Sequence, residues 1–291
     1  MNTQEILEKF GLDFTIEKEV LFGRNSKGDD MITPYFGLFN SKTNECINTA
    51  KAGYTVSQNQ QIVDMILKGM KIFGSQLSVT KAGSINGGRR VYLQLAIDGM
   101  SKVGNDEIKR YVTVIDSNDG STGLSIGIGD KNMWCENEFF KFYKAGQAKF
   151  RHTATITEKI NSIPMLIETS LNESLRQVKV YDKFLSTPLS KNLADKMVKE
   201  VLGYDRVLTS AADYKKLTKR SLAMMDTLYD NIETEINHSG NNLWSLLGGV
   251  TRYTTHHQIT PKRENGKEES LIVGVGYKKS QTAFNFCLEH I

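Results

Sequence analysis

The chain has 291 residues, of which 39% are hydrophobic, 24% charged and 9% aromatic. This composition is typical of a globular protein and excludes a fibrous or wholly disordered chain. No stretch approaches the roughly 20 apolar residues that cross a bilayer, and residues 1–10 lack the apolar run of a secretory signal. Three widely separated cysteines (Cys46, Cys135 and Cys287) predict a reducing, cytoplasmic environment without disulfides.

The formal net charge of +4 is unevenly distributed. Residues 1–140 hold 15 basic and 17 acidic side chains, residues 141–220 hold 16 and 8, and residues 221–291 hold 6 and 8. The middle segment therefore carries +8 between two segments of −2. Such a concentration favours a polyanionic partner such as nucleic acid. The alternative is a set of solvated helix faces without a ligand.

The first half of the chain predicts strands around one helix. The strands are expected at 32–40, 45–50, 77–84, 89–97, 108–115 and 124–128. Turn residues at 86–88 and 118–121 separate some of them. Ser57 has the character of an N-cap before an apolar helical pattern that Gly74 closes. In the strand over 89–97, alternation places Val91, Leu93 and Leu95 on one face and Arg90, Tyr92 and Gln94 on the other.

The second half predicts helices over 157–185, 190–202, 211–236 and 241–256, and a terminal helix within 271–291. Pro164 marks either the start of the first helix or a kink in it. Gly248 and Gly249 disfavour a helix interior by about 1 kcal/mol each, so close packing of another element is one reason to keep them. Residues 261–270 are expected to form a charged loop.

These elements together predict an α+β fold. Residues 1–150 form a mainly antiparallel sheet with one crossover helix. Residues 151–291 form a helical region that packs on this core or extends it.

Enzymatic and metal sites find little support in the spacing of the residues. The cysteines and the pair His256-His257 lack the close ligand pairs of a zinc site, so no metal is expected. No Walker A sequence occurs, and no cofactor is expected. Asp119, Cys135 and one of the two histidines could form a catalytic set only if the fold brought them together.

Basic residues interleaved with aromatic ones are the more suggestive pattern. Lys and Arg neutralise phosphates, and aromatic rings stack on exposed bases. The candidates for phosphate contacts are Arg89, Arg90, Lys109, Arg110, Lys144, Lys149, Arg151, Lys215, Lys216, Lys219 and Arg220. The candidates for stacking are Tyr92 and Tyr143. The alternative is that the aromatic residues belong to the core and the lysines are merely solvated.

Three short motifs carry a family resemblance. They are residues 118–123 (NDGSTG), residues 133–137 (MWCEN), and a segment from Asn242 through Arg252 to His256-His257. In this order they resemble the phage and plasmid-like proteins grouped as domain of unknown function nine-three-two. Asn118, Trp134 and Glu138 depart from the family pattern, which has His, Val and Thr there. A catalytic role for the turn histidine is therefore not expected in this chain.

The resemblance implies a phage, prophage or plasmid protein in a bacterial cytoplasm, encoded near replication and recombination genes. The order of elements also resembles single-strand annealing proteins of the Rad-fifty-two and lambda Red beta type. These resemblances and the basic residues predict an ATP-independent protein that binds and anneals single-stranded DNA as a homo-oligomeric ring or filament. The alternatives are an accessory protein that binds a host protein, or an enzyme.

Overall fold

The computed structural model describes residues 1–142, 149–208 and 211–291. Its strands are β1 (Ile16–Arg24), β2 (Asp30–Asn40), β3 (Cys46–Lys51), β4 (Leu77–Ile85), β5 (Arg90–Ile97), β6 (Ser101–Val103), β7 (Asp106–Ser117), β8 (Leu124–Asn132), β9 (Glu138–Phe142) and β10 (Lys149–Phe150). Its helices are α1 (Thr3–Lys9), α2 (Asn59–Phe73), η1 (Gly74–Gln76), α3 (Ile156–Ile160), α4 (Ile163–Ser186), α5 (Lys191–Leu202), α6 (Ala211–Tyr214), α7 (Lys219–Ser239), α8 (Leu243–Arg252), η2 (Tyr253–His257), α9 (Gly266–Ile272) and α10 (Val275–Glu289). The fold is α+β, as the sequence predicts.

The strands form two antiparallel sheets. A large sheet has the order β10-β8-β7-β5-β4, with β9 beside β8 and β6 beside β7. A small sheet has the order β1-β2-β3. The helix α2 connects the two sheets in the chain, which is the crossover that the sequence predicts.

The inner face of the large sheet forms the main core with α2, α3 and α4. Val91, Leu93 and Leu95 are buried on this face, as their alternation predicts. Ile163 and Ile167 from α4 join the same cluster, and Gly69 of α2 lies so close to α4 that an added Cβ would come within 2.8 Å of Ile167. The long helix α4 therefore belongs to the packing of the sheet.

The outer face of the same sheet is only partly covered. Tyr92, Ile115 and Phe140 pack there against Leu271 and Ile272 of α9. The paired residues Tyr111 and Gly129 lie further along this outer face, toward the end of β7 at which Lys109 stands. The partial cover by α9 leaves space for a cleft.

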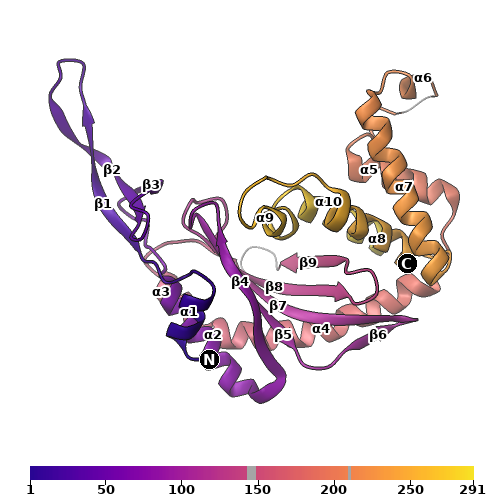
Figure 1. The fold of residues 1–291 in the computed structure, drawn as a ribbon, viewed down its shortest axis with the longest axis horizontal. Coiled ribbons are helices and arrows are strands. Elements are labelled where there is room, and N and C mark those ends of the chain that lie inside the picture. The colour runs from indigo at the N-terminus through magenta and orange to yellow at the C-terminus, as the bar shows by residue number, and fades with distance from the viewer. Residues whose placement is uncertain (143–148, 209–210) are drawn as a thin grey trace.

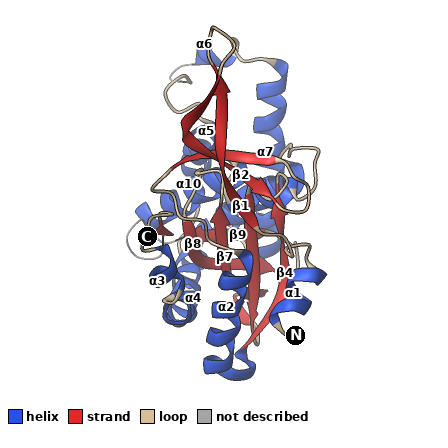
Figure 2. Ribbon diagram, turned by 90° about the vertical axis from the view of Figure 1, so that its left-hand side faces the viewer, coloured by secondary structure: helices blue, strands red, loops and turns tan. Residues whose placement is uncertain are grey.

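Two slender projections extend from the body (Figure 1). One is the hairpin of β1 and β2, and the other consists of α5, α6 and the first part of α7. Figure 2, a quarter turn away, shows α2 at the end of the molecule opposite the α6 tip.

Several elements differ from the sequence-based expectation for local physical reasons. The expected helix over 157–185 is two helices, because Pro164 begins α4 within its first turn. Gln58, rather than Ser57, is the N-cap of α2, because the buried hydroxyl of Ser57 donates to Asp116. The expected loop over 261–270 contains the start of α9.

Gly248 and Gly249 are explained by close packing between α7 and α8. A Cβ on Gly249 would lie 2.6 Å from Cα of Ile232, and a Cβ on Gly248 would lie 3.0 Å from Oε2 of Glu235. At Gly249 only glycine permits this approach to the backbone of α7, which confirms the reason that the sequence suggests.

Candidate nucleic-acid interface

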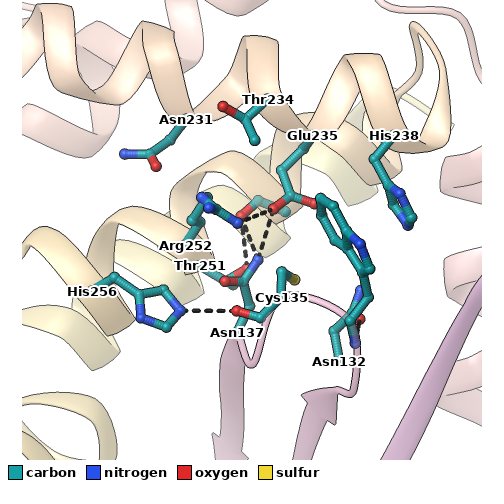
Figure 3. Close-up of polar contacts among 12 residues, drawn as sticks. Asn132, Cys135, Asn137, Asn231, Thr234, Glu235, His238, Thr251, Arg252 and His256 are labelled. Atoms are coloured by element: carbon teal, nitrogen blue, oxygen red, sulfur yellow. Dashed lines mark hydrogen bonds and ion pairs between the residues drawn. The ribbon is translucent and has the colours of Figure 1, made fainter.

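The second and third motifs meet where the β8–β9 turn packs against α7 and α8 (Figure 3). Asn137 Nδ2 donates to Glu235 Oε1 at 3.1 Å and to the carbonyl oxygen of Gly248 at 3.2 Å. Arg252 Nη1 lies 3.5 Å from the same carboxylate oxygen. We call Asn137, Glu235 and Arg252 the motif junction. A single buried carboxylate therefore joins two motifs that lie far apart in the sequence.

Cys135 and His256 also lie at this junction, but their chemistry is structural. The ring nitrogen Nε2 of His256 lies 2.9 Å from the carbonyl oxygen of Cys135, which can only accept a hydrogen bond. Burial, together with the nearby Glu235 carboxylate, raises the pKa of the Cys135 thiol to about 12. A thiol that stays protonated at neutral pH is a poor nucleophile.

A cavity of about 30 Å³ adjoins the motif junction and is lined by Asp130, Asn137, Tyr181 and Glu235, among others. Burial raises the pKa of Asp130 to about 6, although the Tyr181 hydroxyl donates to its Oδ2 at 2.6 Å. Oδ1 of Asp130 and Oδ1 of Asn137 are buried without a protein partner. A cavity of this size has room for about two water molecules. The motif junction is thus a buried polar core, too confined for a substrate.

The first motif lies elsewhere, at the turn between β7 and β8. Asp119 Oδ2 forms an ion pair with Arg90 Nη2 at 3.2 Å, and Ser121 Oγ accepts a hydrogen bond from Arg90 Nε at 2.7 Å. Arg90 also pairs with Glu269 of α9 at 2.9 Å. Asp119 is therefore a partner of Arg90, whereas Cys135 and His256 belong to the motif junction.

The run Lys109-Arg110-Tyr111 on β7 divides between the two faces of the large sheet. Arg110 faces inward, where it is 8% exposed and donates to Ser174 Oγ at 3.0 Å. Lys109 and Tyr111 face outward and are half-buried. In the β7–β8 ladder Lys109 stands directly opposite Lys131. Two lysines in this position repel each other, and an anion between them would relieve the repulsion.

A cleft of about 220 Å³ opens on the part of the outer face that α9 leaves free. Its lining includes Lys81, Gln94, Tyr111, Lys131 and Glu138. Lys81 is paired with Glu268 at 2.7 Å, and Lys131 with Glu136 at 3.3 Å. Burial and the nearby Glu138 raise the pKa of Tyr111, so its phenol stays neutral. We call this cleft, together with Lys109, the outer-face cleft.

A second basic group lies on the same face at the other end of β8. Lys149 pairs with Ser125, six residues before Lys131 on β8. An even separation along a strand keeps the same face, and six residues span roughly 20 Å. Lys149 and Arg151 are both exposed. The outer face thus has cationic side chains at both ends of β8.

Four other predicted residues are occupied by internal partners. Arg89 Nη1 donates to the carbonyl oxygen of Ile47 at 2.5 Å. Arg90 and Arg110 are bound as described above, and Tyr92 is 1% exposed beneath α9. Stacking on a base needs an open ring face, and a phosphate contact needs a free guanidinium. These four residues are not part of the interface proposed below.

The remaining predicted residues lie away from the cleft. Lys215, Lys216, Lys219 and Arg220 are exposed near α6 and the start of α7, at the outer end of the helical projection. Lys216 is paired with Asp213 at 3.0 Å. Tyr143 and Lys144 lie outside the described residues.

Sequence reasoning missed Lys81 and Lys131 as members of the cleft. Each stands alone in a strand, with no basic neighbour in the sequence. Their signal is the strand register, because Lys131 is opposite Lys109 and Lys81 is opposite Gln94. Only a correct alignment of β4, β5, β7 and β8 would have revealed it.

Within residues 1–142, 149–208 and 211–291, no group of three or more His, Cys, Asp or Glu side chains could hold a metal ion. In the same part of the chain, no helix is long and apolar enough to cross a membrane.

Comparison with known proteins gives one match. A family model described as a domain of unknown function, DUF932, matches residues 47–272. No curated protein and no solved structure matches the chain, so the resemblance to annealing proteins has no support from these comparisons. The matched region contains all three motifs and the outer-face cleft. The chain therefore belongs to the DUF932 family.

Proposed function

We propose that the protein binds single-stranded DNA on the outer face of its large sheet, without ATP. The strand crosses the outer-face cleft, where Lys109 and Lys131 contact its phosphates, and Lys149 and Arg151 lie further along the same face, beyond the part that α9 covers. The single observation that carries this proposal is the outer-face cleft, which combines a half-buried tyrosine with lysines on adjacent strands. A role in annealing during phage or plasmid replication or recombination follows from it.

The chemistry of the cleft suits one base and its flanking phosphates. Its volume is below the range of about 300–1,000 Å³ typical of drug-sized ligands, so a single ring is a better fit than a dinucleotide. Tyr111 offers an aromatic surface, and the Gln94 amide can both donate to and accept from a base edge. Lys109 and Lys131 neutralise phosphate charge.

ATP-independent annealing requires that bases stay available for pairing. A cleft that takes up one base and holds the backbone through Lys109 and Lys131 leaves the neighbouring bases exposed, which meets this requirement. Such binding is largely independent of base sequence, because stacking and phosphate contacts carry little sequence information.

The test is fluorescence anisotropy with a labelled oligothymidylate of about 40 nucleotides at low salt. Lys109→Glu combined with Lys131→Glu should weaken binding at least tenfold. Lys179→Glu combined with Lys183→Glu is the matched control, because both lysines are exposed on α4 away from the cleft. This control has the same net charge and should bind nearly as well as the parent protein.

Two outcomes would overturn the proposal. One is no binding to the oligonucleotide at low salt. The other is an equal loss of affinity in the cleft variant and the α4 control, since that would reflect net charge alone. If only a variant of Lys215, Lys219 and Arg220 lost affinity for the oligonucleotide, the interface would lie on the helical projection instead.

A further inference from the structure

The hairpin of β1 and β2 projects from the body beyond the reach of β3 (Figure 1). The strand β3 pairs with β2 only from Tyr35 to Phe39. Residues 20–24 and 30–34 therefore form a ribbon of two strands, which we call the arm. An isolated two-stranded hairpin is marginally stable in water unless something packs on it.

The arm is nevertheless a well-formed element. Asn25 Oδ1 accepts from the backbone nitrogens of Lys27 and Asp29 in the turn, and Arg24 pairs with Asp30 at 3.0 Å. Thr33 Oγ1 donates to the carbonyl oxygen of Leu21 at 2.9 Å. These local contacts hold the hairpin in shape without a hydrophobic core of its own.

The arm exposes large apolar side chains. Phe22 is 67% exposed and Ile32 is 71% exposed, and the two are directly paired across the strands. Val20, two residues before Phe22, is 44% exposed, and the register of β1 against β2 shifts between these two residues. Single exposed apolar residues need no explanation, but a contiguous group on a projecting element marks an interaction surface.

The same chain carries an apolar groove at its opposite end. A groove of about 640 Å³ lies between α1 and α2, and Leu67 and Met70 contribute its apolar lining. Lys68 and Lys71 line it too, and both are exposed with no ion pair among the described residues. Glu17 and Glu19, at the base of the arm, are likewise exposed and unpaired in the described part of the chain. The exposed apolar side chains of the arm match the apolar lining of the groove, and the glutamates at the base of the arm are opposite in charge to the two groove lysines, beside which Asp64 also lines the groove.

We propose that the arm of one copy docks in the α1–α2 groove of a second copy. The arm extends upward in Figure 1 while the far end of α2 lies at the bottom, so a chain cannot fill its own groove. A contact between different surfaces of identical chains is head-to-tail and builds a ring or a filament. The arm precedes residue 47, where the family match begins, whereas Leu67, Lys68, Met70 and Lys71 of the groove lie within the matched region.

Mixing two variants tests this contact without DNA, so its outcome is separate from that of the DNA-binding proposal. The arm variant carries Phe22→Ser and Ile32→Ser, and the groove variant carries Lys68→Glu and Lys71→Glu. Light scattering after size exclusion should give the parent protein at least twice the 32.7 kDa of one chain, and each variant alone a monomer. An equimolar mixture should give a 1:1 dimer and nothing larger, because one intact arm and one intact groove remain.

Ile259→Ser is the matched control, because Ile259 is 73% exposed elsewhere on the protein, and it should assemble like the parent. Disulfide trapping gives the position of the contact: in a Cys46→Ser background, chains with Ile32→Cys should cross-link to chains with Lys71→Cys but not to chains with Lys179→Cys. A monomeric parent protein, an arm variant of parental mass, or a mixture that stays monomeric would each overturn the proposal. The last two outcomes would indicate that the arm serves a different partner.

Discussion

The motif junction and the outer-face cleft are both rich in charged side chains, but they use them differently. At the junction, the Glu235 carboxylate is 3% exposed on its side chain and has two protein partners, Asn137 and Arg252. In the cleft, Lys109 and Lys131 stand opposite each other on adjacent strands, and Lys131 pairs with exposed Glu136 and has Glu138 opposite it on β9. Charge matched by a buried partner supports the fold, whereas a lysine whose partner is an exposed carboxylate can exchange that partner for a ligand.

The largest expected effect comes from removing the carboxylate of the junction. Glu235→Ala leaves Asn137 with the Gly248 carbonyl oxygen but without the carboxylate, and Arg252 without its counter-ion, and should lower the free energy of unfolding by about 3 kcal/mol. Urea denaturation at neutral pH measures it. Glu235→Gln keeps an acceptor and should lose clearly less. Equal losses in both variants would show that the carboxylate charge, and not the hydrogen bond, holds the junction.

Asp130 lines both the small cavity and the cleft, and its effect depends on pH. Burial raises its pKa to about 6, well above the usual value of an aspartate. A raised carboxyl pKa means that the folded state binds the proton more tightly, so stability falls as pH rises from about 4 to about 6. Asp130→Asn cannot ionise and should gain on the order of 2 kcal/mol relative to the parent between pH 4 and pH 7. The prediction would be contradicted if the difference in free energy of unfolding between Asp130→Asn and the parent were the same at pH 4 and at pH 7.

The cleft lysines should affect binding and not folding. Lys109→Gln combined with Lys131→Gln should reduce the slope of log affinity against log salt by about 1.4, since each phosphate contact to a single strand contributes about 0.7. The free energy of unfolding should stay within about 0.5 kcal/mol of the parent value. A slope of log affinity against log salt equal to that of the parent protein would show that neither lysine contacts a phosphate.

The smallest effect concerns the ring of Tyr111. Tyr111→Leu keeps an apolar side chain but loses the aromatic surface, and should weaken oligonucleotide binding several-fold, within the roughly 1–3 kcal/mol that stacking contributes. Tyr111→Phe keeps the ring and should bind like the parent in the same titration. Weakening by both substitutions would point to the hydroxyl instead of stacking.

Much of the fold was predictable because it rests on local patterns. The alternation in β5 gave the buried face of the sheet, and the apolar pattern of α2 gave the crossover helix. The strand β1 was missed, because Ile16 is its one buried residue and the rest of the strand is exposed or half-buried. The three motifs were visible in the sequence, but nothing in their spacing showed that two of them meet at Glu235 while the first contacts Arg90.

The sequence by itself determined the α+β class, the family motifs and the concentration of positive charge, because these depend on composition, periodicity and order along the chain. The tertiary structure alone decided which cations are free. Arg89, Arg90 and Arg110 have the same character in the sequence as Lys109, yet internal partners occupy them. Pairing and burial depend on residues far away in the chain, and strand register and helix packing bring those residues together.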